Sequence, residues 1–336
     1  TLKRIHANGA VGYALITDSS EIEDSLPLYP VMPINAARSL AMLTDREVLT
    51  EPIAVFVRPC ELRAFIELVK LEQGSLENIL IISSTCGGVY PLDMAVTDNI
   101  ENNLENYWTA LQHGEIPDKI RVTCQGCEHF LPYHADITVA LIGNDRNTSC
   151  NLFLHTDKAR EFLKGIDGEM GDEELNTQEI IRYREQRIAA RESLFAEMNL
   201  EQSGLDGLVN IYGKCIGCHG CSSVCPICYC ALCFFDSKLN ELSASGYEQE
   251  MKKRGGTRVP GKTIFYHIGR LSHMSISCAG CGACTDVCPV DIPLSAIFLK
   301  TSHVTQGMYD YIAGRDLDEP IPLQVFKEQE LAGFER

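Results

Sequence analysis

Residues 215–226 read Cys-Ile-Gly-Cys-His-Gly-Cys-Ser-Ser-Val-Cys-Pro, and residues 278–289 read Cys-Ala-Gly-Cys-Gly-Ala-Cys-Thr-Asp-Val-Cys-Pro. Both stretches have the spacing C-x-x-C-x-x-C-x-x-x-C-P. Bacterial ferredoxins bind two 4Fe–4S clusters with this spacing, because three close cysteines hold one cluster and the fourth holds the other. The sequence therefore predicts two clusters with crossed ligands. One would bind Cys215, Cys218, Cys221 and Cys288, and the other Cys278, Cys281, Cys284 and Cys225.

Two other uses of clustered cysteines fit this sequence less well. A zinc site typically uses two C-x-x-C pairs rather than two runs of four. A disulfide framework belongs to oxidising compartments, whereas the first residues of this acidic chain lead into no signal-type apolar run. We therefore expect a cytoplasmic protein whose cysteines bind metal.

Length and charge narrow the class of protein further. The 336 residues suffice for two domains with a sizeable core. A net charge of −17 argues against nucleic acid or an anionic membrane as a partner. No apolar run approaches the ~20 residues of a membrane-spanning helix.

The first half of the chain alternates between two hydrophobic patterns. Short apolar runs indicate buried strands, and the segments between them have the 3.6-residue spacing of amphipathic helices. Strands are predicted at 53–57, 78–83, 119–123 and 137–142, and helices at 61–71 and 98–112. This alternation predicts an α/β domain with a largely parallel sheet, which we place at residues 1–155.

Cysteines follow three of these predicted strands. Cys60, Cys86 and Cys124 each come just after a strand, and Cys127 follows closely. The carboxyl ends of parallel strands meet at one edge of a sheet, so these four thiols would suit a third 4Fe–4S cluster. Two alternatives stay open: ordinary buried thiols at Cys60 and Cys86, and zinc at Cys124 and Cys127.

The second half is predicted to be mainly helical. Residues 156–208 would form a helical linker, in which 177–199 predict a long exposed helix rich in Glu and Arg. Its arginines are read as a solvated face of i,i+4 ion pairs, with an acidic partner or a phosphate as the alternative. Residues 209–300 would form an α-helical two-cluster ferredoxin-like domain, and 301–336 a C-terminal tail.

Several residues near the cysteine runs have more than one interpretation. Arg258, Lys262 and Arg270 are basic residues in an acidic chain. They are candidates for binding the pyrophosphate of a dinucleotide such as FAD, or equally for balancing the charge of clusters and carboxylates. No G-x-G-x-x-G follows a predicted strand. Four cysteines receive no role: Cys150, Cys228, Cys230 and Cys233.

Taken together, these motifs resemble a known family. Residues 58–64 (Arg-Pro-Cys-Glu-Leu-Arg-Ala), 84–88 (Ser-Thr-Cys-Gly-Gly) and 124–127 (Cys-Gln-Gly-Cys), with 214–230, are similar to the beta subunits of coenzyme F420-reducing hydrogenases and F420-type formate dehydrogenases. The resemblance implies a non-covalent FAD with a cluster beside it in the α/β domain, and makes Arg58 a further candidate flavin ligand. In such proteins the flavin exchanges a hydride with a soluble carrier and passes single electrons to the clusters.

The order of the motifs resembles one variant of this family. A sheet domain followed by the cysteine runs is similar to beta subunits paired with formate dehydrogenase alpha subunits, including those attached to heterodisulfide reductase-type complexes. The resemblance implies an oxidoreductase subunit whose partner carries the molybdenum or tungsten formate site, with coenzyme F420 or ferredoxin as carrier. No catalytic residue is assigned. The alternatives are a flavin-free electron conduit, a hydrogenase beta subunit, or a stand-alone reductase.

Overall fold

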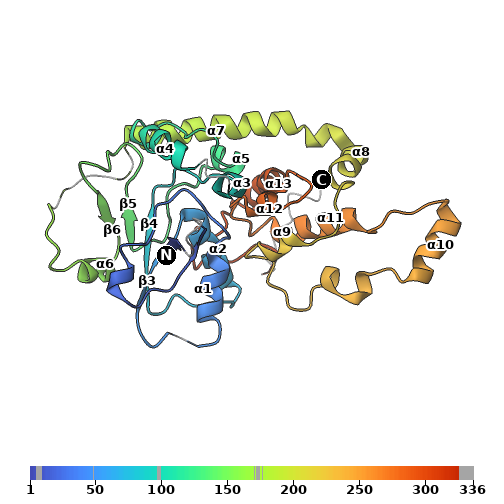
Figure 1. Ribbon diagram of the computed structural model, residues 1–336, viewed down its shortest axis with the longest axis horizontal. Coiled ribbons are helices and arrows are strands. Elements are labelled where there is room, and N and C mark those ends of the chain that lie inside the picture. The colour runs from blue at the N-terminus through green and yellow to red at the C-terminus, as the bar shows by residue number, and fades with distance from the viewer. Residues whose placement is uncertain are drawn as a thin grey trace.

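The computed structural model places a sheet domain beside a helical domain (Figure 1). It describes residues 1–4, 10–47, 49–96, 100–169, 171, 175 and 177–324. Within these residues, none of the helices is both long and apolar enough to cross a bilayer. The predicted fold class, a largely parallel α/β sheet plus a helical cluster domain, is confirmed.

The main sheet has the strand order β3-β4-β5-β6. Strands β3 (Ile53–Phe56), β4 (Ile79–Ser84) and β5 (Ile137–Val139) are parallel, and β6 (Leu152–Leu154) pairs antiparallel with β5. The central strand β4 is covered on both faces, as its continuous apolar sequence predicts. A separate two-stranded antiparallel sheet joins β1 (Leu2–Arg4) and β2 (Val11–Tyr13).

The helices of the sheet domain supply its core. These helices are α1 (Ala37–Thr44), α2 (Pro59–Lys70), α3 (Leu92–Val96), α4 (Glu101–Gln112), α5 (Val122–Gln125) and α6 (Asp157–Phe162). Helix α2 begins directly after β3 with Pro59 in its first turn, where a missing N–H is tolerated. The Glu61 carboxylate accepts the Arg58 N–H at 2.8 Å, which satisfies a donor at the helix start.

The strand predicted at 119–123 is wrong. Lys119 has a φ of +60°, and the Arg121 N–H donates to the Val89 carbonyl at 2.8 Å. These features turn the segment away from the sheet, where β5 pairs with β4 directly. The apolar run instead ends in the single turn of α5.

Helix α7 (Gln178–Met198) is the long linking helix that the sequence predicts. Figure 1 shows it running from the sheet side toward α8 (Leu200–Tyr212) on the ferredoxin side. The expected solvated arginine face is wrong at two positions, since Arg187 is 1% and Arg191 7% exposed. Arg191 pairs with Glu128, while Arg187 reaches the cysteines described below.

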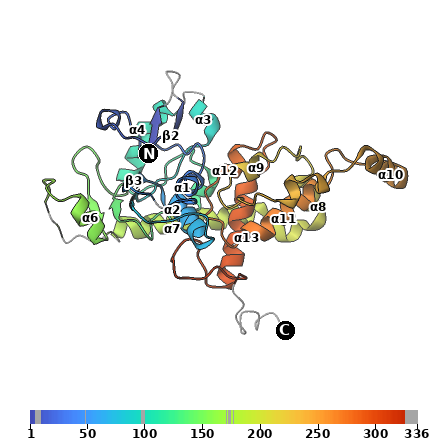
Figure 2. The same ribbon diagram turned by 90° about the horizontal axis from the view of Figure 1, so that it is seen from below.

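The helical domain is built around the two cysteine runs. Its elements are α9 (Gly220–Ser223), η2 (Phe234–Asp236), η3 (Lys238–Asn240), α10 (Ala244–Arg254), α11 (Thr263–Met274), α12 (Ala283–Asp286) and α13 (Leu294–Met308). The one-turn helices α9 and α12 contact each other. Helix α10 projects away from the rest of the chain in both ribbon views (Figures 1 and 2).

The two domains share one hydrophobic core. Val55 and Phe65 of the sheet domain belong to the same cluster of buried side chains as Met274, Ala279 and Phe298 of the helical domain. Helix α13 runs through residue 300, and the segment after it returns to α2. There the Arg63 Nε donates to the Ala313 carbonyl at 2.7 Å.

Candidate iron–sulfur centres

The two cysteine runs have the same backbone conformation. Gly217 and Gly280, at matching positions, have φ angles of +70° and +68°. This left-handed conformation favours glycine, and it turns each N–H onto the preceding cysteine sulfur. Gly217 N lies 3.4 Å from Cys215 Sγ, and Gly280 N lies 3.4 Å from Cys278 Sγ. Each loop therefore presents an amide proton to a sulfur, a contact that favours a thiolate.

The thiols of the two runs are grouped across the runs. Cys288 from the second run lies beside Cys215 of the first. Cys225 from the first run lines a cavity of about 30 Å³ with the other cysteines of the second set: Cys278, Cys281 and Cys284. We call these groups the first set (Cys215, Cys218, Cys221, Cys288) and the second set (Cys225, Cys278, Cys281, Cys284). The structure thus brings together the predicted groups, and their role as cluster ligands stays a prediction.

Four further thiols converge in the sheet domain as a third set (Cys60, Cys86, Cys124, Cys127). Cys60 lies in the first turn of α2, Cys86 follows β4, and Cys124 lies in α5. Burial, with a smaller contribution from neighbouring thiols, raises the pKa of Cys60 well above its usual value. Gly88, at φ +98°, permits the close approach, because a Cβ there would lie 2.9 Å from the Cys124 Cβ.

The spacing of the thiols bears on the kind of metal centre. In the described part of the chain, no three His, Cys, Asp or Glu side chains are close enough to hold a single metal ion. Zinc would need its sulfur ligands about 2.3 Å from one centre, whereas ligands around a 4Fe–4S cube stand farther apart. Four thiols in each set make up the donor set of a 4Fe–4S cluster.

The three sets form a continuous series. Cys60 of the third set lies beside Cys281 of the second, and both pack against the buried cluster of Met32, Val89 and Ala283. The second set adjoins the first through α9 and α12. At the far end of the first set, Cys218 is exposed to solvent. The series therefore runs from the buried edge of the sheet to the surface of the helical domain.

Arginines bind the main chain of cysteines in all three sets. Their guanidinium groups donate to cysteine carbonyls at 2.7–3.3 Å: Arg121 to Cys281, Arg187 to Cys86, Arg258 to Cys215 and Arg270 to Cys221. The positive charge of Arg121 near Cys281, of Arg187 near Cys86 and of Arg270 near Cys225 lowers the pKa of these thiols against the larger effect of burial or of a neighbouring thiol. The roles of Arg121 and Arg187 were missed in the sequence.

Arg121 also joins the two domains. It is 3% exposed, and its Nη2 lies 2.6 Å from the Asp286 carboxylate and 2.9 Å from the Met32 carbonyl. Burial raises the pKa of Asp286, and Arg121 opposes that rise. The only feature of the sequence that could have indicated this role is the position of a charged residue, Arg121, between the apolar residues Ile120 and Val122.

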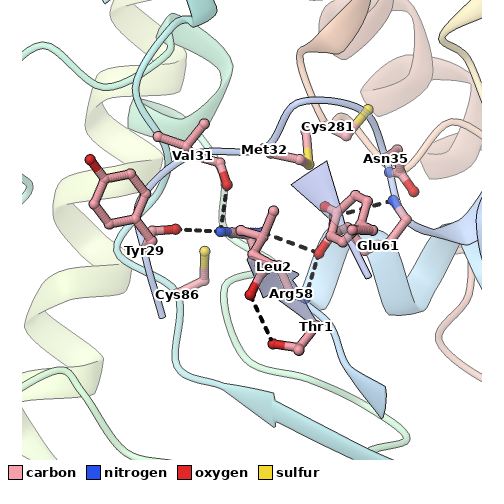
Figure 3. A network of polar contacts seen from close by, with 12 residues as sticks. Thr1, Leu2, Tyr29, Val31, Met32, Asn35, Arg58, Glu61, Cys86 and Cys281 are labelled. Carbon is pink, nitrogen blue, oxygen red and sulfur yellow. Dashed lines mark hydrogen bonds and ion pairs between the residues drawn. The ribbon is translucent and has the colours of Figure 1, made fainter. Parts of the chain in front are cut away.

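The four candidate flavin ligands do not come together. Arg58 lies in the sheet domain, where its Nη2 donates to the carbonyls of Tyr29 and Val31 beside Cys86 (Figure 3). Arg258 and Arg270 bind cysteine carbonyls, as described above, and Lys262 donates to the Asn240 carbonyl at 3.2 Å. Because these side chains already donate hydrogen bonds to main-chain carbonyls, they are poorly placed to bind a flavin pyrophosphate. Flavin binding by these residues stays a prediction.

The cysteines without a predicted role lie in different surroundings. Cys228 is half-buried beside Cys225, and a hydrogen bond with Cys225 lowers the pKa of Cys228 to about 7. Cys150 and Cys230 are exposed, and Cys233 is partly exposed.

An α/β domain joined to a helical domain with crossed cysteine runs defines an iron–sulfur protein. In agreement, residues 211–292, which include both runs, match the family model described as a 4Fe-4S dicluster domain. Beyond this domain, the chain is similar to two curated proteins over most of its length.

The F420-dependent formate dehydrogenase subunit beta of Methanocaldococcus jannaschii is 29% identical over 340 residues, covering 91% of this chain and 84% of the relative. The F420-dependent formate dehydrogenase 1 subunit beta of Methanococcus maripaludis is 28% identical, covering 80% of this chain and 74% of the relative. The predicted resemblance to these oxidoreductase subunits is confirmed.

Proposed function

We propose that this chain is the electron-transfer beta subunit of a formate dehydrogenase complex. Its part is to carry electrons between a catalytic subunit, which oxidises formate, and a two-electron carrier such as coenzyme F420. The observation that carries the proposal is the continuous series of three cysteine sets. The names of the two relatives supply the substrate and the carrier.

The side chains of this protein would hold the clusters apart at fixed spacing. Arg121 ties the sheet domain to the second set through Asp286 and the Cys281 carbonyl. The shared core behind it keeps the third and second sets in register. Such fixed placement is what a protein contributes to cofactor chemistry.

Formate oxidation releases two electrons and a proton with carbon dioxide, whereas each cluster passes one electron at a time. FAD, when bound, would supply the conversion between a hydride and single electrons. A cavity of about 230 Å³ touches Cys127 of the third set and Cys278 of the second, with Arg63, Arg191 and His129 in its wall. We propose this cavity, rather than the four predicted ligands, as the place where a flavin or deazaflavin ring contacts the chain.

A second candidate function is a flavin-free electron conduit to ferredoxin or to a heterodisulfide reductase-type partner. This second candidate is favoured because Arg58, Arg258 and Arg270 lie apart and already donate hydrogen bonds to main-chain carbonyls. Flavin content of the purified complex separates the two candidates, because only the first requires a stoichiometric flavin.

The test uses the native complex purified without oxygen. Replacing the exposed Cys218 with alanine should abolish formate-driven reduction of coenzyme F420 while formate still reduces an artificial dye at the catalytic subunit. The matched control is Cys150→Ala, an exposed cysteine outside the three sets. Full formate-driven F420 reduction by Cys218→Ala would show that electrons from the catalytic subunit do not pass through the first set.

A further inference from the structure

The cavity of the second set contains polar hydrogens that no nitrogen or oxygen atom of the described residues accepts, although they lie beside cysteine sulfurs. Asn35 and Arg270 line this cavity together with Cys225, Cys278 and Cys281. The Asn35 Nδ2 and the Arg270 Nε and Nη1 are buried and have no hydrogen-bond partner in the described chain. Such orphaned donors are rare in folded proteins, so each needs an explanation.

Asn35 is held in a fixed orientation. The side chain is fully buried, and its Oδ1 accepts the Ala37 N–H at 3.0 Å. That bond leaves the amide NH₂ as the free end, next to the Cys281 thiol. Figure 3 shows Asn35 and Cys281 on neighbouring segments. The sheet domain thus directs a neutral donor at a sulfur of the helical domain.

Arg270 brings a full positive charge to the wall of the same cavity. It is 4% exposed, and its Nη2 donates to the Cys221 carbonyl at 3.1 Å. The ionisable groups that act most strongly on the guanidinium are the thiols of Cys221, Cys228 and Cys225 and the Tyr266 hydroxyl, none of them a carboxylate. The guanidinium carbon also lies 5.8 Å from the centre of the Tyr266 ring and 5.1 Å from that of Phe298. A buried arginine without an anionic partner is strongly unfavourable. A cluster held by four thiolates is anionic and would supply that partner.

The second set needs such donors more than its neighbours do. It lies between the third and first sets, in a cavity lined by Ala279, Ala283 and Phe298. Adding an electron to an anionic cluster in apolar surroundings, between two other anionic clusters, is electrostatically unfavourable. Without compensation, the middle cluster would interrupt electron flow along the series.

We propose that Asn35 and Arg270 donate hydrogen bonds to the sulfurs of the cluster in the second set and raise its reduction potential, keeping it level with its neighbours. Hydrogen bonds to cluster sulfurs and net charge are established determinants of such potentials. The proposal rests on the second set holding a cluster, and it requires neither the formate-oxidising partner nor the carrier.

The test is a redox titration of the anaerobically purified full chain, followed by electron paramagnetic resonance with iron counted per chain. Cys281→Ser identifies the signal of the second set. Arg270→Gln, which removes the charge, and Asn35→Leu, which removes the donor, should each shift that signal to a lower midpoint potential with iron retained. Arg254→Gln, the control that removes an exposed positive charge on α10, should leave it in place.

An unchanged second-set potential in both variants, with iron retained, would overturn the proposal. If Arg270→Gln loses iron, Arg270→Lys should restore the iron and hold the potential near that of the unaltered chain. If the lysine variant also loses iron, Asn35→Leu decides by the same criterion. A chain with no second-set signal at all would overturn the premise. None of these outcomes depends on the formate assay. The proposed function can therefore fail while this proposal stands, and the reverse.

Discussion

At the residue scale, the third set is made of thiols that are far apart in the sequence and are brought together by the fold. Cys60, Cys86 and Cys124 come from α2, the end of β4 and α5. Their surroundings differ from ordinary core packing, because Arg187 donates to the Cys86 carbonyl and Gly88 N lies 3.4 Å from the Cys86 sulfur.

Replacing Cys60 with alanine tests whether this set holds a cluster. We expect the variant to lose about four irons, the content of one 4Fe–4S cluster, while the signals of the first and second sets persist. Iron analysis with paramagnetic resonance measures both. Cys150→Ala is the control, and iron content equal in the two variants would make Cys60 a packing thiol.

A buried histidine near the first set makes stability depend on pH. His267 is 1% exposed and stacks on Tyr212 at 4.4 Å between ring centroids. Burial, with a smaller contribution from Arg270, lowers its pKa to about 4. An unfolded histidine titrates near pH 6.5. Between about pH 6.5 and pH 4, the unfolded state therefore binds a proton at His267 that the folded state does not bind. Stability should therefore fall as pH drops through this window, by up to about 2 kcal/mol at pH 5.

His267→Phe keeps the ring stack and removes the titration. Unfolding of the iron-loaded chain, followed between pH 7 and pH 5, should show a shallower loss of stability in the variant. Identical slopes in both proteins would assign the acid sensitivity to the clusters or to other groups.

At the scale of elements, the sequence predicts best what local pattern decides. The apolar runs of β3 and β4 and the length of α7 follow from periodicity, and the crossed cysteine groups follow from spacing. The segment at 119–123 fails because the chain turns at Lys119, which has a positive φ, and because Ile120 is buried while Val122 is exposed. Arg187 and Arg191 fail because a helical charge pattern does not reveal which face a distant cysteine loop will cover. Asn35 has no local signal either, since its neighbour Cys281 lies in the other domain.

The segment after α13 provides a test of how the two domains are held together. Gly314 has a φ of +70°, and a Cβ there would lie 2.2 Å from the Arg63 carbonyl oxygen. Its N–H donates to Glu67 at 2.8 Å. Gly314→Ala should therefore destabilise the chain by at least about 1–3 kcal/mol and expose residues 309–321 to protease.

The matched control is Gly307→Ala within α13, where no neighbour lies within 4 Å of the added Cβ. Alanine there should stabilise the helix by up to about 1 kcal/mol. Thermal unfolding with limited proteolysis compares the two variants. Equal melting temperatures and equal cleavage would mean that the returning segment does not secure α2.

At the scale of the whole molecule, the sheet and the cysteine runs behave as one structure. Arg63 donates to the carbonyls of Ala279 and Ala313, and Arg38 donates to the Ser223 carbonyl at 2.6 Å. These contacts and the shared core keep the third set against the second. Electron transfer through a series of clusters depends on such fixed spacing, which neither domain would provide alone.

The central claim is that three cysteine sets hold three 4Fe–4S clusters in series. Its most direct test is the iron and sulfide content of the anaerobically purified chain, measured together with flavin. The account predicts about twelve irons and twelve sulfides per chain, and one flavin if the cavity beside Cys127 binds it. About eight irons and no flavin would contradict it, leaving a two-cluster ferredoxin domain attached to a sheet with no redox centre.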